Sequence, residues 1–243
     1  MPLAPLDFLN GLLSLLTVIT SLIVGILIVS KYFKYEKKTF LYLGIAWIGA
    51  YQPWWPAAIS FISILVTEQG LTAPFYIIIG SLFIPIFLIS FILGVTEMIM
   101  EGRRNQLLII YSIIMIIAEI LIIYYLVTDY TRIGILARDF DMEYERIMSA
   151  YLLFINLTIV IMGILFSRQS LRSDIPDVRL KGKILITAFV AYFIGAFLDA
   201  GIFSLTATTL IIARIILITG SILFYVGFIL PDFIKKFLGL DKT

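Results

Sequence analysis

Long apolar runs alternate with short polar segments along the whole chain, and this pattern predicts the secondary structure. A helix needs about 20 apolar residues to cross the hydrocarbon of a bilayer, because it rises about 1.5 Å per residue. We therefore predict an all-α fold, a polytopic bundle of seven transmembrane helices within residues 1–231, followed by a short amphipathic basic tail, 232–243. The predicted spans are 8–30, 39–66, 75–99, 107–127, 147–167, 184–205 and 208–230.

The positions of the basic residues predict the orientation of these helices. Of the 18 Lys and Arg residues, 14 fall in the first, third and fifth connections and in the tail, and only Arg132, Arg138 and Arg146 fall in connections on the opposite side. Cytoplasmic connections carry the excess of Lys and Arg in membrane proteins. We expect an outside N-terminus and a cytoplasmic C-terminus in a multi-pass protein of the cell membrane. The first apolar run has no basic residue before it and is expected to be a retained helix.

Composition supports the membrane assignment and narrows the chemistry. Hydrophobic residues make up 61% of the chain and charged residues 14%, with a mean hydropathy of +1.08, whereas soluble domains are roughly 45–50% apolar. The chain has no Cys and no His, which excludes Cys- or His-ligated zinc, haem and iron–sulfur sites and a Ser-His-Asp triad. The last span has no lysine for a retinal Schiff base. We expect no cofactor, no metal site and no enzyme activity, and a net charge of +2 indicates no nucleic-acid partner.

Two charged residues, Asp199 and Arg214, lie inside the last two apolar runs. An ionised side chain at membrane depth costs about 2.5 to 3.5 kcal/mol on insertion scales, so it is normally paired or functional. The connection between the two spans is short, which makes the helices antiparallel neighbours and places both residues roughly 10 Å below the outer surface. We predict an interhelical ion pair, with Ala191 and Gly195 allowing close approach of the next helix. A structural role and a ligand-binding role both remain open.

Proline residues interrupt the second span. Pro53 and Pro56 remove backbone donors and are expected to break the helix and leave carbonyl groups in need of partners. Interrupted helices often line binding sites in membrane proteins. The adjacent Trp54 and Trp55 are suited to walling a pocket, and equally to an aromatic belt at the outer interface. Pro85 predicts a second kink, in the third span.

Several polar residues share the depth of the charged pair and predict a pocket in the outer half of the bundle. Each of these residues could instead make a packing contact between helices, and Glu119 could also act in a proton relay. The acidic connection 129–145 is positioned to cover such a pocket. The predicted ligand-binding residues are Gln52, Trp54, Trp55, Glu119, Asn156, Asp199 and Arg214.

The chain resembles uncharacterised archaeal seven-helix integral membrane proteins, whose plan is similar to the seven-helix sensor region of some histidine kinases. The residues that carry this resemblance are Pro53-Trp54-Trp55-Pro56 with Ser60-Phe61, Arg179-Leu180-Lys181-Gly182-Lys183, Asp199, and Phe224-Tyr225-Val226-Gly227-Phe228-Ile229-Leu230-Pro231. Only residues 232–243 follow the last span, so no kinase domain accompanies it here. The resemblance implies a sensor-like membrane module that signals through a separate protein.

Three functions remain open on the sequence. The first is a sensor or receptor-like protein with an outer-half pocket for a small-molecule or lipid ligand, acting on a membrane or cytoplasmic protein partner. The second is a transporter or channel, which predicts a continuous polar path through the bundle. The third is a structural subunit of a membrane complex. The polar residues gather in the outer half while the inner halves of the spans are Ile, Leu and Phe, which favours the sensor. The lipid bilayer itself is the one partner common to all three.

Overall fold

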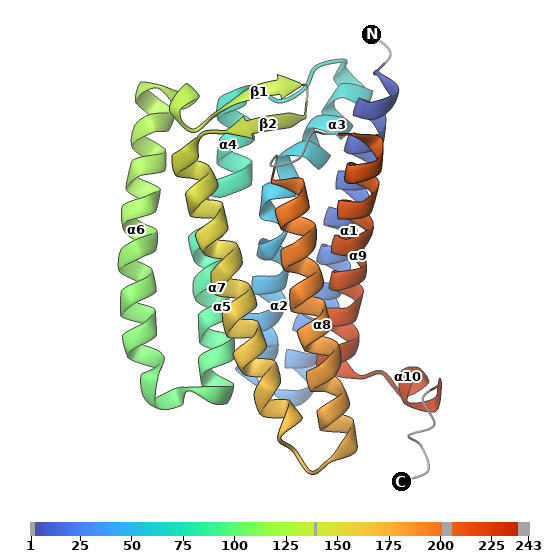
Figure 1. Cartoon of the computed structure of the whole chain (residues 1–243). Helices are drawn as coiled ribbons and strands as arrows, with labels where there is room; N and C mark the ends of the chain where they lie inside the picture. Colours follow the sequence, from blue (N-terminus) through green and yellow to red (C-terminus); the bar gives the residue numbers. More distant parts are fainter. Residues whose placement is uncertain (1–2, 139, 201–205, 238–243) are drawn as a thin grey trace.

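A computed structural model of the protein describes residues 3–138, 140–200 and 206–237, which form a bundle of long helices with a small hairpin at one end (Figure 1). The helices are α1 (Pro5–Tyr35), α2 (Lys38–Ala50), α3 (Trp55–Thr67), α4 (Ala73–Ser81), α5 (Ile84–Ile99), α6 (Arg104–Thr128), α7 (Arg146–Leu171), α8 (Pro176–Asp199), α9 (Ala207–Ile229) and α10 (Asp232–Phe237). Short 3-10 turns are η1 (Gln52–Trp54), η2 (Glu101–Arg103) and η3 (Tyr130–Arg132), and the strands are β1 (Gly134–Arg138) and β2 (Asp141–Tyr144). The predicted all-α class is confirmed, with this hairpin as its one addition in the described chain.

Six stretches of the described chain are long and apolar enough to cross a membrane. They are α1, α4 with α5, η2 with α6, α7, α8 and α9. This is the architecture of a multi-pass membrane protein. The predicted span 39–66 is not among them, because η1 divides it into α2 and α3 of 13 residues each. The break falls at Pro53, as predicted, and Pro85 follows a second break between α4 and α5.

The predicted boundaries of the sixth span are wrong. Helix α8 starts at Pro176, eight residues before the predicted start at 184, because proline is well suited to the first turn of a helix. Since α7 continues to Leu171, the connection predicted over 168–183 shrinks to 172–175. At its other end α8 stops at Asp199, so this residue closes the helix rather than lying two turns inside it. Residues 201–205 of the predicted span lie outside the described residues.

Helices α8 and α9 pack closely through small residues, as predicted for Gly195. A β-carbon added at Gly195 would come within 2.7 Å of Leu217 Cγ and 3.1 Å of the Ala213 carbonyl oxygen. A β-carbon added at Gly220 on α9 would lie 3.2 Å from the Tyr192 backbone nitrogen of α8. Small residues let helix backbones approach, and dispersion contacts then hold the helices together in a medium as apolar as lipid.

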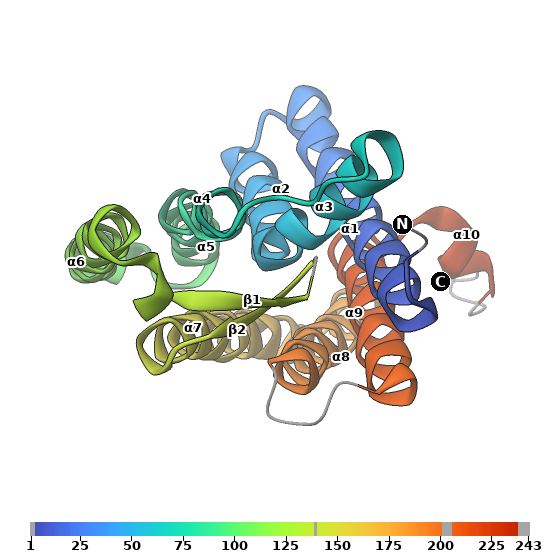
Figure 2. The same ribbon diagram turned by 90° about the horizontal axis from the view of Figure 1, so that it is seen from above.

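The two ends of the bundle differ. The strands β1 and β2 lie across one end, between α4 with α5 on one side and α7 with α8 on the other (Figures 1 and 2). We call this the hairpin end; helix α1 begins there and α10 lies at the opposite end, the α10 end. Helix α6 stands at the periphery and buries only Met115 and Ile122 among its own residues. The basic turns between α1 and α2, α5 and α6, and α7 and α8 all lie at the α10 end.

The acidic connection 129–145 contains an antiparallel hairpin. Gly134 pairs with Tyr144 and Arg138 with Asp141, and the register is irregular between Leu136 and Arg138. Phe140 and Met142 are buried in a hydrophobic cluster with residues of α3 and α4. This packing fixes the hairpin over the bundle. The predicted tail is a short helix over Asp232–Phe237, and 238–243 lie outside the described residues.

Candidate functional site

The predicted ion pair between Asp199 and Arg214 is present at the hairpin end. Arg214 Nη2 lies 3.3 Å from Asp199 Oδ2, and the two side chains are 5% and 14% exposed. Arg214 is the eighth residue of α9, two turns below its start, while Asp199 is the last residue of α8. Gly195 packs against Ala213 and Leu217, and Gly220 packs against Tyr192, so the antiparallel register of α8 and α9 places Asp199 close to the level of Arg214, as predicted.

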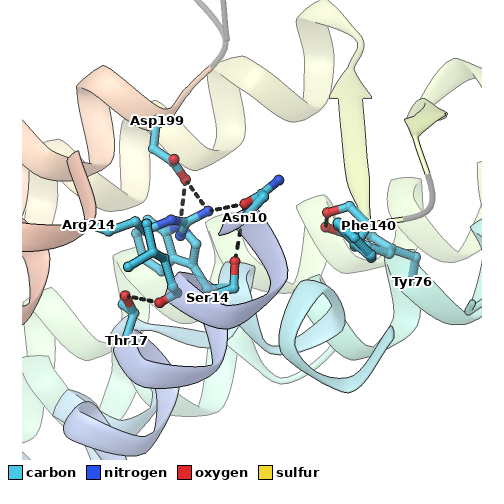
Figure 3. A network of polar contacts seen from close by, with 9 residues as sticks. Asn10, Ser14, Thr17, Tyr76, Phe140, Asp199 and Arg214 are labelled. Atoms are coloured by element: carbon cyan, nitrogen blue, oxygen red, sulfur yellow. Dashed lines mark hydrogen bonds and ion pairs between the residues drawn. The ribbon is translucent and has the colours of Figure 1, made fainter. Parts of the chain in front are cut away.

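Residues of α1 and η1 complete this pair and form a buried polar network with it (Figure 3). The Trp54 indole N–H donates to Asp199 Oδ2, and the Arg214 guanidinium lies 5.8 Å from the centre of the Trp54 ring. Arg214 Nη2 also donates to Asn10 Oδ1 at 3.2 Å, and the Ser14 hydroxyl donates to the same oxygen at 3.4 Å. The buried polar network, Asn10, Trp54, Asp199 and Arg214, thus joins α1, η1, α8 and α9.

Side-chain hydrogen bonds join the break in the second segment to α8, α9 and α4. The Tyr192 hydroxyl donates to the Ala50 carbonyl at 2.8 Å, and the Tyr51 hydroxyl donates to the Leu217 carbonyl at 2.9 Å. Gln52 Nε2 donates to the Ile79 carbonyl at 2.9 Å, beside the break between α4 and α5. The expected partner of a carbonyl group at this break is therefore the Tyr192 side chain of α8, which binds Ala50.

A cavity of about 760 Å³ lies beside the buried polar network, between α2 and α5 on one side and α7 and α8 on the other. Its walls near the network include Asn10, Trp54, Asp199 and Arg214, and the hairpin contributes residues 140–144. Its remaining walls are largely apolar and aromatic. They include Trp47, Leu88, Phe91, Ile159 and Ala196. This volume matches that of pockets for small organic ligands, which are mostly apolar with a few placed polar groups.

The structure gathers four of the seven predicted site residues at this cavity. Trp54, Asn156, Asp199 and Arg214 line it. Gln52 is fully buried but does not line the cavity. Trp55 packs its ring on Phe87, at 5.7 Å between ring centres, and its indole nitrogen has no hydrogen-bond partner among the described residues.

Glu119 lies on peripheral α6, away from this cavity, with both carboxylate oxygens lacking a hydrogen-bond partner in the described chain. A residue at the right depth lies near the site only when its side of the helix faces that site. The sequence of α6 is rich in isoleucine all round, so it does not reveal which side of α6 faces the bundle.

Sequence reasoning missed Asn10, Tyr76, Asp141, Tyr144 and Tyr192, all of which line the cavity. Asn10 carries a detectable signal, because it starts a helical stripe of buried polar residues on α1 with Ser14, Thr17 and Ser21. The hairpin residues carry none. The acidic connection was a predicted cover, but the residues that point inward follow from a strand register that the sequence does not reveal.

Asp141 is the one half-buried carboxylate that the hairpin brings to the cavity wall beside the network. Within the described chain, no hydrogen bond or ion pair joins its side chain to a neighbour, since the nearby Arg138 pairs with Asp7 at 3.4 Å. Burial raises the pKa of the Asp141 carboxyl above its usual range, and the charge of Asp199 raises it further, while Arg214 and Arg138 act in the opposite direction. Its ionised form therefore destabilises the folded protein.

Replacing Asp141 with asparagine is expected to raise the melting temperature at neutral pH. Because the pKa of Asp141 is higher in the folded chain than in the unfolded chain, stability falls as pH rises through that interval, and the penalty is absent below the unfolded value. The gain in Asp141→Asn should therefore shrink as the pH is lowered toward 4, a reference value for an unperturbed aspartate. Thermal unfolding of both proteins across this range measures it. A destabilised variant at neutral pH contradicts this account.

Comparison with protein-family models, with curated proteins and with solved structures finds no match for this chain. The family resemblance described from the sequence therefore stays a prediction, and the functional assignment depends on the cavity and its walls.

Proposed function

We propose that the protein is an integral membrane sensor of the receptor-like class, which binds a small molecule or lipid in the cavity under the hairpin. The observation that supports this most is the cavity itself, about 760 Å³ in volume, beside a buried polar network that joins four separate segments. Buried charges in membrane proteins are expensive and typically mark functional sites. A ligand in this cavity contacts side chains of every segment in the network.

The proposed arrangement in the bilayer has seven crossings, with the second made jointly by α2, η1 and α3. Helices α2 and α3 both pack along α1, and the break between them is supported by side-chain hydrogen bonds. The gathering of basic turns at the α10 end supports a cytoplasmic location for that end, and an outward-facing cavity at the hairpin end. The N-terminus is then outside, in agreement with the resemblance to seven-helix sensor modules.

Signalling in this proposal is a shift between two packings of α8 and α9 against α1. A ligand that contacts Asp199 and Trp54 has different affinities for packings that hold these side chains differently, which is what a population shift requires. Helices α8 and α9 extend from the cavity to the α10 end, where a partner protein would detect the change. A transporter is less well supported, because the bundle below the cavity is filled by Ile28, Leu43, Ile92 and Leu185, each buried.

Filling the cavity is expected to abolish ligand binding. A thermal-shift screen of small molecules and lipids on the protein in nanodiscs should yield compounds that raise its melting temperature. Ala196→Leu, at a buried position of the cavity wall, should remove these shifts. Ile194→Phe is the matched control, because Ile194 lies on the same helix, is 42% exposed and does not line the cavity.

The cavity variant must itself be folded for this comparison, which its unliganded melting temperature reports. If Ala196→Leu unfolds, Leu153→Trp is a second way to fill the cavity, since Leu153 lines it and has room as a half-exposed residue. The proposal fails if no compound stabilises the protein, or if the shifts persist unchanged in folded cavity variants.

A further inference from the structure

We propose that the ligand of this cavity is a positively charged amphiphile, with an ammonium group paired to Asp141, an oxygen acceptor bound by Asn10, and an apolar tail in the aromatic part of the cavity. This inference rests on the proposed function of the cavity as a binding site and specifies the chemical class of its ligand.

The charges on the cavity wall select a cation. Asp141, Glu143 and Asp199 contribute three carboxylates, and Arg214 is the single basic residue among the described residues of the wall. Because Arg214 is already paired with Asp199, the other two carboxylates have no ion-pair partner among the described residues of the wall. Glu143 is exposed to solvent, whereas Asp141 is half-buried and close enough to the network for its pKa to respond to Asp199 and Arg214. An ammonium group beside Asp141 neutralises this charge where it is least hydrated.

Aromatic side chains surround the same part of the wall. Phe140 precedes Asp141 in the hairpin, and the Tyr76 hydroxyl donates to the Phe140 carbonyl at 3.1 Å. Tyr144 and Trp54 also line the cavity. The faces of aromatic rings attract cations, most strongly where water is excluded, and carboxylate together with aromatic walls is the arrangement that recognises organic ammonium groups. A metal ion is not favoured, since the described residues contain no group of three carboxylates within reach of one ion.

Asn10 supplies a second, independent contact for a ligand. Its side chain lines the cavity and is 3% exposed, and its Oδ1 accepts from Arg214 and Ser14. Because the guanidinium can only donate, this oxygen is fixed, and the amide nitrogen lies on the side away from Arg214 (Figure 3). In the described chain that nitrogen has no hydrogen-bond acceptor. A hydroxyl or carbonyl oxygen near the ligand's ammonium group satisfies it.

The rest of the cavity accommodates an apolar tail. Leu88, Phe91 and Ile159 line it below the hairpin, and none of them offers a polar side-chain atom. On the side of α7 and α8, Leu153 and Phe197 line the cavity while remaining 44% and 37% exposed. The described part of this wall therefore carries apolar side chains that are shared between the cavity and the outer surface of the bundle.

The unfavourable environment of the Asp141 carboxylate in the unliganded protein also supports a cationic ligand. Its carboxylate destabilises the fold and lacks a structural partner in the described chain, so packing does not explain its presence. An ionised ligand that pairs with it relieves the penalty in the bound state, which adds to the binding free energy of a cation and subtracts from that of an anion.

The test compares four probes with one tail: 2-amino-1-octanol, octylammonium, 1-octanol and octanoate, in nanodiscs of phosphatidylglycerol. We expect the amino alcohol to raise the melting temperature most, octylammonium less, and the two uncharged or anionic probes not at all. Asp141→Asn should weaken the affinity for both amines by about tenfold to a hundredfold, as for loss of a charged hydrogen bond. Asp129→Asn, an exposed hairpin-end carboxylate outside the cavity, is the control and should leave both affinities unchanged.

Two further arms separate the sources of the ammonium group. If the natural ligand is a membrane lipid, adding phosphatidylethanolamine to the discs should stabilise the wild type and compete with octylammonium, and Asp141→Asn should abolish both effects. If it is a free amine, phosphatidylethanolamine should have no effect while the short amines still bind. The proposal is overturned if octanoate or octanol binds as well as the amines, or if Asp141→Asn binds the amines normally. Cavity-dependent binding of an anion overturns this ligand class and leaves the proposed function standing, whereas binding that ignores Ala196→Leu removes both.

Discussion

Replacing Arg214 with methionine is expected to cause the largest loss of stability of any single substitution in the buried polar network. The change removes the guanidinium from Asp199 and from Asn10 Oδ1, and both acceptors remain buried with no other arginine in the described chain to reach them. Removing one partner of a buried ion pair costs about 3–5 kcal/mol, because the other charge is left uncompensated. Thermal unfolding in nanodiscs of uncharged lipid measures this loss and avoids competition from lipid headgroups.

Two companion variants separate the ion pair from simple packing. Asp199→Asn keeps an oxygen that accepts from the Trp54 indole and from Arg214, so its loss of stability should be smaller. The double variant Asp199→Leu with Arg214→Met removes both charges and should recover much of the stability lost in Arg214→Met, since hydrophobic residues of similar volume often replace buried pairs without cost. If the double variant is as unstable as the sum of its single changes, the pair has no coupling energy and the network is held by packing alone.

Replacing Gly49 with alanine is expected to be the second most damaging change. A β-carbon at this position of α2 would lie 1.7 Å from Phe87 Cγ and 2.2 Å from Phe87 Cβ, close to the α5 backbone rather than at a flexible tip. The helices must therefore separate or Phe87 must leave its rotamer. Such overpacking costs about 1–3 kcal/mol, and more when the backbone has to move. The melting temperature should fall well below that of the wild type.

A second-site change distinguishes overpacking from loss of backbone freedom. Phe87→Ala removes the obstructing ring, so Gly49→Ala combined with Phe87→Ala should be more stable than predicted by adding the two single effects. Gly102→Ala is the matched glycine control, because a β-carbon there meets no atom within 4 Å. Equal damage from Gly49→Ala and Gly102→Ala would show that helix contact at Phe87 is not the cause.

The helices were largely predictable because each rests on a local signal. Apolar runs of about 20 residues locate most of the membrane-length helices, and Pro53 and Pro85 locate the two breaks. The Asp199–Arg214 pair was predictable for a related reason, since a short connection forces two helices to be neighbours. The predicted span 39–66 is the exception. Its halves, α2 and α3, have 13 residues each and are each too short to span a bilayer, so a crossing there remains a proposal.

The site was only partly predictable because its composition depends on which helix faces which. Glu119 and Asn156 looked equivalent in depth, but α7 packs between α5 and α8 whereas α6 contacts mainly α5 at the edge. Asn156 therefore lines the cavity and Glu119 does not. Asp141 was hidden for another reason. Its inward position follows from the register of a short hairpin pinned by Phe140 and Met142, a tertiary effect with no local signal.

The hydrogen bond between Asn10 and Arg214 spans 204 residues of sequence, almost the whole chain. During synthesis, Asn10 and Trp54 are therefore made long before the arginine that completes their network, and Asp199 precedes it by part of a helix. Until α9 is made, the carboxylate at the end of α8 lacks the arginine that pairs with it in the folded protein, and an unpaired buried charge is costly. Helix α9 thus closes the network that α1 begins, and the hydrogen bond to Asn10 forms only after both helices have been made.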